Sequence, residues 1–420
     1  MARTKRLAFA AVLALALWAA IELACWLGLR YLAAEKGLDY APRAWAGLRF
    51  KQGQSLRALL AGAPTYVIHD PRLGWTLRPD AVSERAGGLV YRTSSRGLRA
   101  DRDPPPEPPP GTVRIAACGD SFTHGSDVGF ADTWGERLEE LDPRLEVLNF
   151  AVIGYGTDQA WLRCRELAPA FRPHVALLGI MSDNPLRNVN TFRPFLFARS
   201  ALPFAKPRFR LDGDRLRLVP NPLPRLEDYR ALLGEEADAA LRRIGEHDFV
   251  YRRDNARAPL DVLPSMRLAH VTSRARRPPA VGPDGAYEPD GEPARVTAAI
   301  AGAFAREALE AGRLPVVLML PNLEDLRAAR RGDPTRYSTV AAEIARRGVP
   351  VVDAAGGFAE LAADAPLRRL VRSHYTVRGN RVVAAHLAAW LGERGLTRPE
   401  AVAAAAAEVE AAMAEAREAG

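Results

Sequence analysis

A serine stands between two glycines in the stretch GDSFTHG, residues 119–125, directly after the apolar run Val113–Cys118. Strand ends often carry Gly, Asp and Ser because these residues form turns. A turn here would also expose the hydroxyl of Ser121 as a nucleophile. A serine hydroxyl reacts poorly unless a base takes its proton and hydrogen-bond donors stabilise the oxyanion that forms. The chain must therefore supply a base and an oxyanion hole from other segments.

Polar and glycine residues follow two further apolar runs. The stretch NFAVIGYG places Gly154 and Gly156 after the run Leu145–Phe150, where backbone N–H groups can approach a substrate closely. The stretch LGIMSDN places Asn184 after Val175–Met181, and an asparagine amide can donate a hydrogen bond to an oxyanion. Sites in open parallel sheets lie at the carboxyl ends of strands. We therefore expect these residues to converge on the serine.

Histidines are the candidate bases. His374 lies in the polar stretch RSHYTVRGN, just before a helical pattern, and we interpret it as the general base. His124 follows the serine by three residues, and we interpret it as a loop-packing residue. A polar cluster follows the third apolar run and is either a solvated loop or a set of contacts to an anionic or sugar substrate; its candidate substrate contacts are Arg187, Asn188 and Arg193. Asn188 is also an alternative to Asn184 as an oxyanion donor.

Four blocks in this order are similar to the SGNH/GDSL hydrolase superfamily: GDSFTHG, NFAVIGYG, a strand ending in Asn, and a late histidine followed by T-x-x-G-N-R. The resemblance covers roughly residues 112–190 and 297–396, and the whole order also resembles membrane-anchored bacterial members. It implies that Ser121 is the nucleophile and that His374 is the base and then the acid for the leaving alcohol. The oxyanion hole would be formed by the backbone N–H of Ser121, that of Gly154 and the side chain of Asn184.

The chain departs from this superfamily at the acid that orients the histidine. The superfamily has an aspartate three or two residues before the histidine, and here those positions hold Val371 and Arg372. Two alternatives stay open: a Ser–His dyad steadied by a backbone carbonyl, or a carboxylate supplied from further away by Asp353 or Asp364. An aspartate introduced at position 371 would be expected to restore the usual partner. The third block is also irregular, because the usual Gly-x-Asn-Asp appears as GIMSDN.

Apolar runs alternate with helical patterns along most of the chain, which indicates βαβ units and a parallel sheet. We expect strands at Val113–Cys118, Leu145–Phe150, Val175–Met181, Pro315–Leu320 and Val349–Val352, and helices at Thr133–Leu141, Asp158–Leu167, Arg295–Ala311, Tyr337–Arg347 and Asn380–Leu391. The fold class is therefore α/β, and the resemblance implies a flavodoxin-like three-layer sandwich. The alternation is lost over about 191–296, which has one helical pattern at Leu226–Ile244, so we expect a lid-like insertion there.

The N-terminal sequence predicts a membrane-spanning segment. Three basic residues within residues 1–6 precede the apolar run Leu7–Leu29, which is long enough to span a bilayer and has Glu22 as its one charge. A basic start favours a cytoplasmic N-terminus. We expect an uncleaved single-pass anchor with the catalytic domain periplasmic or extracellular; a signal peptide cleaved near Ala24 is the alternative. Glu22 would either sit at the interface or face a partner helix.

The chain divides into five parts by composition and pattern. These are a cytoplasmic tail (1–6), the transmembrane anchor (7–29), a juxtamembrane segment with a small β-rich preface and a Pro-rich linker (30–111), the hydrolase-like domain with its insertion (112–396), and an Ala-rich tail that is helical or disordered (397–420).

Composition excludes several classes of protein. The net charge is +8, but the basic residues are scattered and form no stripe with interleaved aromatics, so we expect no nucleic-acid partner. The three cysteines form no C-x-x-C pair, which argues against a disulfide framework or a zinc site, although a single Cys118–Cys164 bridge stays open. We expect no metal and no cofactor.

The resemblance favours a serine esterase or deacylase that hydrolyses an O-acyl ester on an envelope carbohydrate, or on a small ester, through an acyl-enzyme. An O-acetyltransferase that modifies an extracytoplasmic polysaccharide with the same Ser/His site is the alternative, because acceptor choice depends on pocket shape. A non-catalytic membrane-anchored binding protein is a second alternative, which the missing aspartate favours. The lipid bilayer is an expected partner through residues 7–29, and the oligomeric state is left open.

Overall fold

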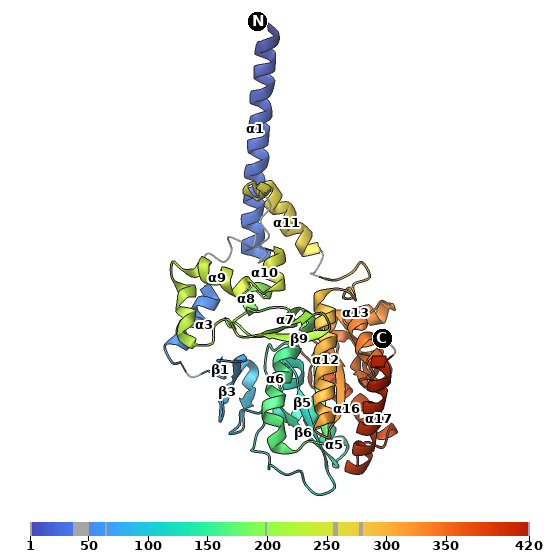
Figure 1. Ribbon diagram of the computed structural model, residues 1–420. Helices are drawn as coiled ribbons and strands as arrows, with labels where there is room; N and C mark the ends of the chain where they lie inside the picture. The colour runs from blue at the N-terminus through green and yellow to red at the C-terminus, as the bar shows by residue number, and fades with distance from the viewer. Residues whose placement is uncertain are drawn as a thin grey trace.

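The computed structural model describes residues 2–36, 50–63, 65–197, 200–254, 259–276 and 280–418. Its centre is a five-stranded parallel sheet with the strand order β11-β10-β7-β5-β6 (Figure 1). The strands are β5 (Val113–Cys118), β6 (Leu145–Asn149), β7 (Val175–Met181), β10 (Leu314–Leu320) and β11 (Val351–Asp353). This order is flavodoxin-like, with the switch point between β5 and β7. The predicted fold class is confirmed, and β5 and β7 have the predicted bounds.

Both faces of the sheet are covered by helices, which explains why the strands are continuous apolar runs. On β5, Ala116 and Cys118 belong to one core cluster, while Ile115 and Ala117 belong to the other. The first cluster includes residues of α6 (Thr157–Leu167), α12 (Glu292–Glu310) and α14 (Ser338–Arg346). The second includes residues of α5 (Trp134–Leu141), α15 (Ala354–Leu361) and α16 (Val377–Glu393). These two layers and the sheet form the three-layer sandwich.

The predicted insertion lies outside the sheet. It contains α8 (Arg193–Leu196), the hairpin β8 (Arg208–Asp212) and β9 (Arg215–Val219), the 3₁₀ helix Leu226–Leu233, and the helices α9 (Ala237–Gly245), α10 (Phe249–Asp254) and α11 (Pro264–Arg276), with a short 3₁₀ turn Pro259–Val262 before α11. Among the described residues, none of its strands joins the central sheet. The prediction of a single helix over Leu226–Ile244 is wrong, because the helical segment is interrupted at Gly234, where the backbone is extended.

A buried ion pair joins the insertion to the sandwich. Lys206 Nζ donates to Asp158 Oδ2 of α6 at 2.5 Å and to the carbonyl oxygen of Arg187 at 3.0 Å, and both charged side chains are buried. Removing one partner of such a pair leaves an uncompensated buried charge, at a cost of roughly 3–5 kcal/mol. The start of the insertion is therefore part of the rigid core.

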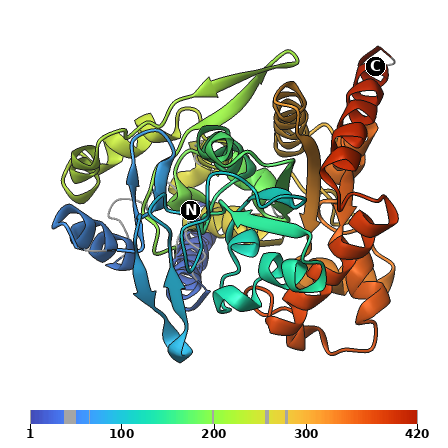
Figure 2. The same ribbon diagram turned by 90° about the horizontal axis from the view of Figure 1, so that it is seen from below.

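The β-rich preface, residues 65–102, forms two antiparallel pairs. These are β1 (Val67–Asp70) with β2 (Gly74–Leu77), and β3 (Val82–Glu84) with β4 (Val90–Arg92). The preface packs on the sandwich: Trp75 Nε1 donates to the Ile153 carbonyl at 3.0 Å, and the Tyr155 hydroxyl donates to the Trp75 carbonyl at 2.6 Å. It lies on the opposite side of the domain from the C-terminal helix, as the light blue and red ribbons show (Figure 2).

The two ends of the chain are helical. α1 (Ala2–Tyr31) projects from the domain and is, among the described residues, the one helix long and apolar enough to cross a membrane (Figure 1). A π-helical turn, Leu32–Lys36, and α3 (Phe50–Leu60) follow; the juxtamembrane positions 37–49 lie outside the described residues. α17 (Pro399–Glu418) packs its buried residues Val402, Ala406 and Met413 against the domain, so the Ala-rich tail is a helix with one buried face. Three further helices follow strands of the sheet: α4 (Ser121–His124) after β5, α7 (Asn184–Asn188) after β7, and α13 (Leu323–Arg331) after β10.

Candidate active site

The predicted nucleophile lies at the switch point of the sheet. Ser121 opens the short helix α4 (Ser121–His124), three residues after the end of β5. Close packing of this turn requires glycine: a Cβ on Gly119 or on Gly179 of β7 would lie 2.2 Å from Thr123 Oγ1. Asp120 caps the turn by accepting a hydrogen bond from the Phe122 N–H at 2.9 Å. Thr123 of this turn therefore packs closely against Gly119 and against Gly179 of β7.

His374 meets a carboxylate that the sequence did not indicate. Its Nδ1 lies 3.0 Å from Oδ2 of Asp127, which follows Ser121 by six residues in the loop after α4. The hydroxyl of Ser373 donates to the same carboxylate. The aspartate side chain is 52% exposed and the histidine side chain 23% exposed, so the pair lies at the surface of the site.

The conformation of Asp127 is set by its neighbours. It has a left-handed backbone (φ 72°), which is uncommon outside glycine and is most tolerated by Asn and Asp. Its N–H donates to the hydroxyl of Tyr91 in the preface at 2.8 Å. The hydrogen bond from His374, and then that from Ser373, lower the pKa of Asp127 to about 2. Asp127 is therefore an ionised acceptor for the histidine.

The two predicted orienting acids do not contact His374. Asp353 caps α15 by accepting from the Ala355 N–H at 2.9 Å and also accepts from the Tyr337 hydroxyl at 2.7 Å. Asp364 is exposed after α15. The prediction that either one supplies the carboxylate is corrected, because Asp353 is engaged elsewhere and Asp127 occupies the position on Nδ1. The only signal for Asp127 in the sequence is an acidic residue in the turn GSDVG, beyond the nucleophile.

Aromatic packing places His374 beside the turn that contains Ser121. Its ring packs on Phe122, the residue after Ser121, with centroids 5.2 Å apart. Tyr375 packs edge-on against the same ring at 4.9 Å, and its hydroxyl donates to the Pro321 carbonyl. α16 then begins at Val377, capped by the side chain of Thr376. His374 therefore lies next to the turn that contains Ser121.

Asp120 is the centre of a buried polar cluster. Its Oδ2 accepts from Arg187 Nη1 at 2.7 Å and from Asn184 Nδ2 at 3.2 Å. Both donors belong to α7 (Asn184–Asn188), which follows β7, and both also donate to the Tyr155 carbonyl. The predicted Asn184 therefore lies next to the nucleophile turn, with its amide hydrogens directed at protein acceptors. To bind an oxyanion, this amide would have to exchange one of them.

Of the remaining predicted residues, Gly154 and Arg193 lie beside the Asp120 cluster, whereas Gly156 and Asn188 are held in contacts within the domain. Gly154 has a left-handed backbone (φ 83°), and its carbonyl accepts from Arg193 Nη1 at 2.8 Å, so both lie beside the Asp120 cluster. The N–H of Gly156 donates to Gln159 Oε1, which engages it in capping α6. Asn188 is fully buried, donates to Thr297 Oγ1 and accepts from the Asp158 N–H. Asn188 is therefore a core residue, which corrects its reading as a substrate contact.

His124 is buried away from solvent. Its Nε2 lies 2.8 Å from the Tyr66 hydroxyl, and its ring packs edge-on against Tyr66 and Tyr91. Burial, and then the positive charge of Arg99, lower its pKa well below the usual value. His124 is a neutral packing residue between the nucleophile loop and the preface, as the sequence analysis interpreted it.

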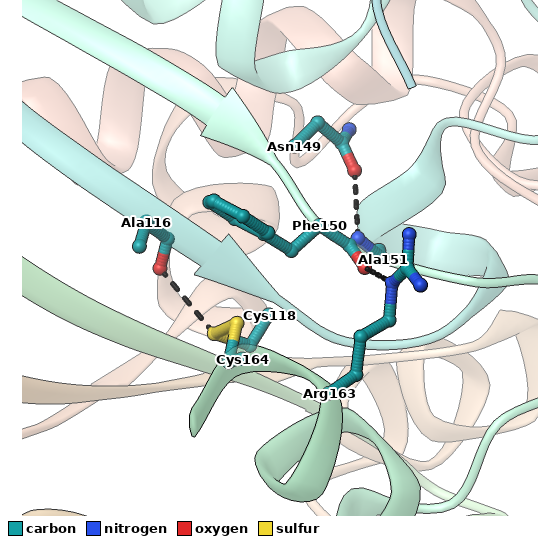
Figure 3. Close-up of a disulfide and its surroundings, with 7 residues drawn as sticks. All are labelled: Ala116, Cys118, Asn149, Phe150, Ala151, Arg163 and Cys164. Atoms are coloured by element: carbon teal, nitrogen blue, oxygen red, sulfur yellow. Dashed lines mark hydrogen bonds between the residues drawn. A yellow bond between two sulfur atoms is a disulfide. The ribbon is translucent and has the colours of Figure 1, made fainter. Parts of the chain in front are cut away.

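A disulfide joins the end of β5 to α6 (Figure 3). It links Cys118, three residues before Ser121, to Cys164, whose Cα lies 6.0 Å away. Next to it, Arg163 Nε donates to the Phe150 carbonyl at the end of β6. The bridge that the sequence left open is therefore present, and it braces β5, the strand that leads to Ser121.

Comparisons with known proteins give distant likenesses. One solved structure, described as a lipolytic protein of the G-D-S-L family from Desulfitobacterium hafniense DCB-2, is 11% identical with a TM-score of 0.31 and covers 66% of this chain and 99% of its own. A second is 13% identical with a TM-score of 0.34 and covers 67% and 97%. No family model matches the chain, and no curated protein matches it.

Proposed function

We propose that the chain is a serine esterase or deacylase that hydrolyses an O-acyl ester on an envelope carbohydrate through an acyl-enzyme. The observation that carries the proposal is the His374–Asp127 pair on the ring of Phe122, next to Ser121. It supplies the orienting carboxylate that the local motif lacks. This pair supports a catalytic site over a non-catalytic binding protein.

The residues divide the reaction between them. Asp127 accepts the Nδ1–H of His374, which leaves Nε2 unprotonated and able to act as a base. His374 takes the proton of Ser121 as its Oγ attacks the acyl carbonyl, and returns it to the leaving alcohol. Water then attacks the acyl-enzyme with His374 again as the base, releasing the free acid and Ser121. The N–H groups of Ser121 and Gly154 and the amide of Asn184 are the proposed oxyanion donors.

A fluorophosphonate probe tests whether Ser121 is an activated nucleophile. The full chain in detergent should become labelled, and the labelled peptide should contain Ser121. Ser121→Ala should abolish labelling, whereas Ser95→Ala, at an exposed serine of the preface, should not. Labelling that persists in Ser121→Ala would refute the assignment. Turnover of a short acyl ester should release free acid; transfer of the acyl group to a glycan without free acid would identify an acyltransferase instead.

A further inference from the structure

The charged residue in the apolar part of α1 has a partner in the insertion. Glu22 is the one charge between Leu7 and Leu29. Its carboxylate accepts hydrogen bonds from the N–H of Ser265 at 2.9 Å and from the Ser265 hydroxyl at 2.6 Å. Ser265 lies in the first turn of α11, 243 residues along the chain. A carboxylate is favoured at that end of a helix, and the contact satisfies a charge that is costly in lipid.

A second contact continues this pairing. Leu268 Cδ2 lies 3.7 Å from the point where a Cβ on Gly28 would stand, so its side chain covers the bare backbone of α1. α11 starts beside α1 and slopes from it toward the domain (Figure 1). The two helices therefore pack together near the outer end of the membrane segment.

The depth of the contact follows from helix geometry. The run Leu7–Leu29 extends about 35 Å as a helix, compared with about 30 Å for the hydrocarbon core of a bilayer. Glu22 lies about 10 Å before the end of this run. If α1 spans the membrane with its N-terminus inside, Ser265 lies within the outer leaflet and not above it.

The segment that carries Ser265 ends in an apolar tip. Leu260 is 57% exposed, Val262 71% and Met266 40%. Outside α1, the described residues include seven exposed large hydrophobic side chains, and these are three of them. An exposed apolar tip beside a membrane-spanning helix is typical of an element that inserts between acyl chains.

We propose that residues 259–276 form a second membrane-contacting element. Leu260, Val262 and Met266 enter the outer leaflet beside α1, and the Glu22–Ser265 contact holds the element on the membrane helix. The domain is then fixed to the bilayer at two points. α7, at the carboxyl end of β7, lies on the side of the sheet nearer α1 (Figure 1). The edge of the sheet that carries the candidate site therefore faces the membrane. This proposal requires that α1 remains attached, and it does not rest on ester hydrolysis.

Fluorescence quenching by lipids tests the depth. A polarity-sensitive dye is placed at Val262→Cys in the full chain carrying Cys25→Ser, reconstituted into phosphatidylcholine–phosphatidylglycerol vesicles. Lipids with a quencher on the acyl chain should remove most of its fluorescence. The dye at Leu361→Cys, an equally apolar exposed position on the domain (54% exposed), should keep its fluorescence. Equal quenching at the two positions, or none at position 262, would overturn the proposal.

A cross-link tests the docking of α11 independently of lipid depth. Glu22→Cys with Ser265→Cys, again in the Cys25→Ser chain, should form a disulfide on mild oxidation, detected as two peptides that stay joined after proteolysis. Leu13→Cys with Ser265→Cys should not. The Cys118–Cys164 bridge serves as an internal check that each variant is folded. Absence of the 22–265 cross-link in a folded variant, or a mature chain that begins after Ala24 by mass spectrometry, would contradict the proposal.

Discussion

Nδ1 of His374 and Oδ2 of Asp127 lie 3.0 Å apart, although 247 residues separate them. The aspartate comes from the loop that also carries the proposed nucleophile, not from the segment that carries the histidine. The two parts of the polar site are thereby tied to each other across the rim of the sheet. The contact also involves the preface, since the Tyr91 hydroxyl accepts the Asp127 N–H.

Asp127→Asn should lower kcat for a short acyl ester by roughly a thousandfold or more, because the histidine loses the acceptor that selects its reactive tautomer. The circular dichroism spectrum and the melting temperature should change little, since Asp127 is half exposed. Asp364→Asn, at an exposed acid, is the matched control and should keep full activity. Full activity of Asp127→Asn would remove Asp127 from the mechanism.

The dependence of kcat/KM on pH should show no limb from Asp127 above about pH 3. Its pKa of about 2 in the folded chain lies below the ordinary 3.8, so it stays ionised on acidification and any stability it adds is lost only as the pH falls toward 2. A limb above pH 3 that is present in the unmodified chain and absent from Asp127→Asn would argue against this assignment.

Val371→Asp should destabilise the protein and should not restore activity to Asp127→Asn. The sequence alone suggests the opposite, because an aspartate at 371 matches the family pattern. In the structure Val371 is fully buried in the core and forms a bridge with Tyr375. An unpaired carboxylate there is strongly unfavourable. A lower melting temperature would confirm this, and rescue of Asp127→Asn by the double variant would contradict it.

Reduction of the Cys118–Cys164 bridge should lower the free energy of unfolding. The bridge closes a segment with a sequence separation of 46, for which the chain-entropy estimate is about 4 kcal/mol. Cys164→Ser should accordingly melt at a lower temperature than the unmodified chain, while Cys25→Ser should not. Equal melting temperatures with and without a reductant would show that the bridge adds no stability.

Glu136→Gln should stabilise the chain at alkaline pH. Burial, and then the nearby charge of Glu139, raise the pKa of Glu136 to about 7 from 4.5. The folded state therefore binds more protons than the unfolded state between these values, and stability falls as pH rises through them. The variant should have the same melting temperature as the unmodified chain at pH 4.5 and a higher melting temperature at pH 8. Glu393→Gln, at an exposed position, should not show this difference.

The sequence by itself was sufficient to predict the sheet and to place Ser121 at its edge. Strands buried on both faces must be continuous apolar runs, so β5 and β7 could be located by composition alone. Strand ends gather at one edge of a parallel sheet, which brought Ser121 and the α7 residues together without knowledge of any contact. The position of His374 just before a helix could also be predicted, because Thr376 is a typical helix-capping residue.

Only the tertiary structure decided which carboxylate hydrogen-bonds to His374 and which residue hydrogen-bonds to Glu22. Asp127 and Ser265 reach their partners across long separations in the chain, and neither stretch of sequence differs from an ordinary loop or helix start. Such contacts depend on how loops and insertions pack, including a left-handed backbone at Asp127 and a hydroxyl from the preface. Local residue types do not predict that packing, because hydrogen bonds between residues far apart in the sequence form only in the folded tertiary structure.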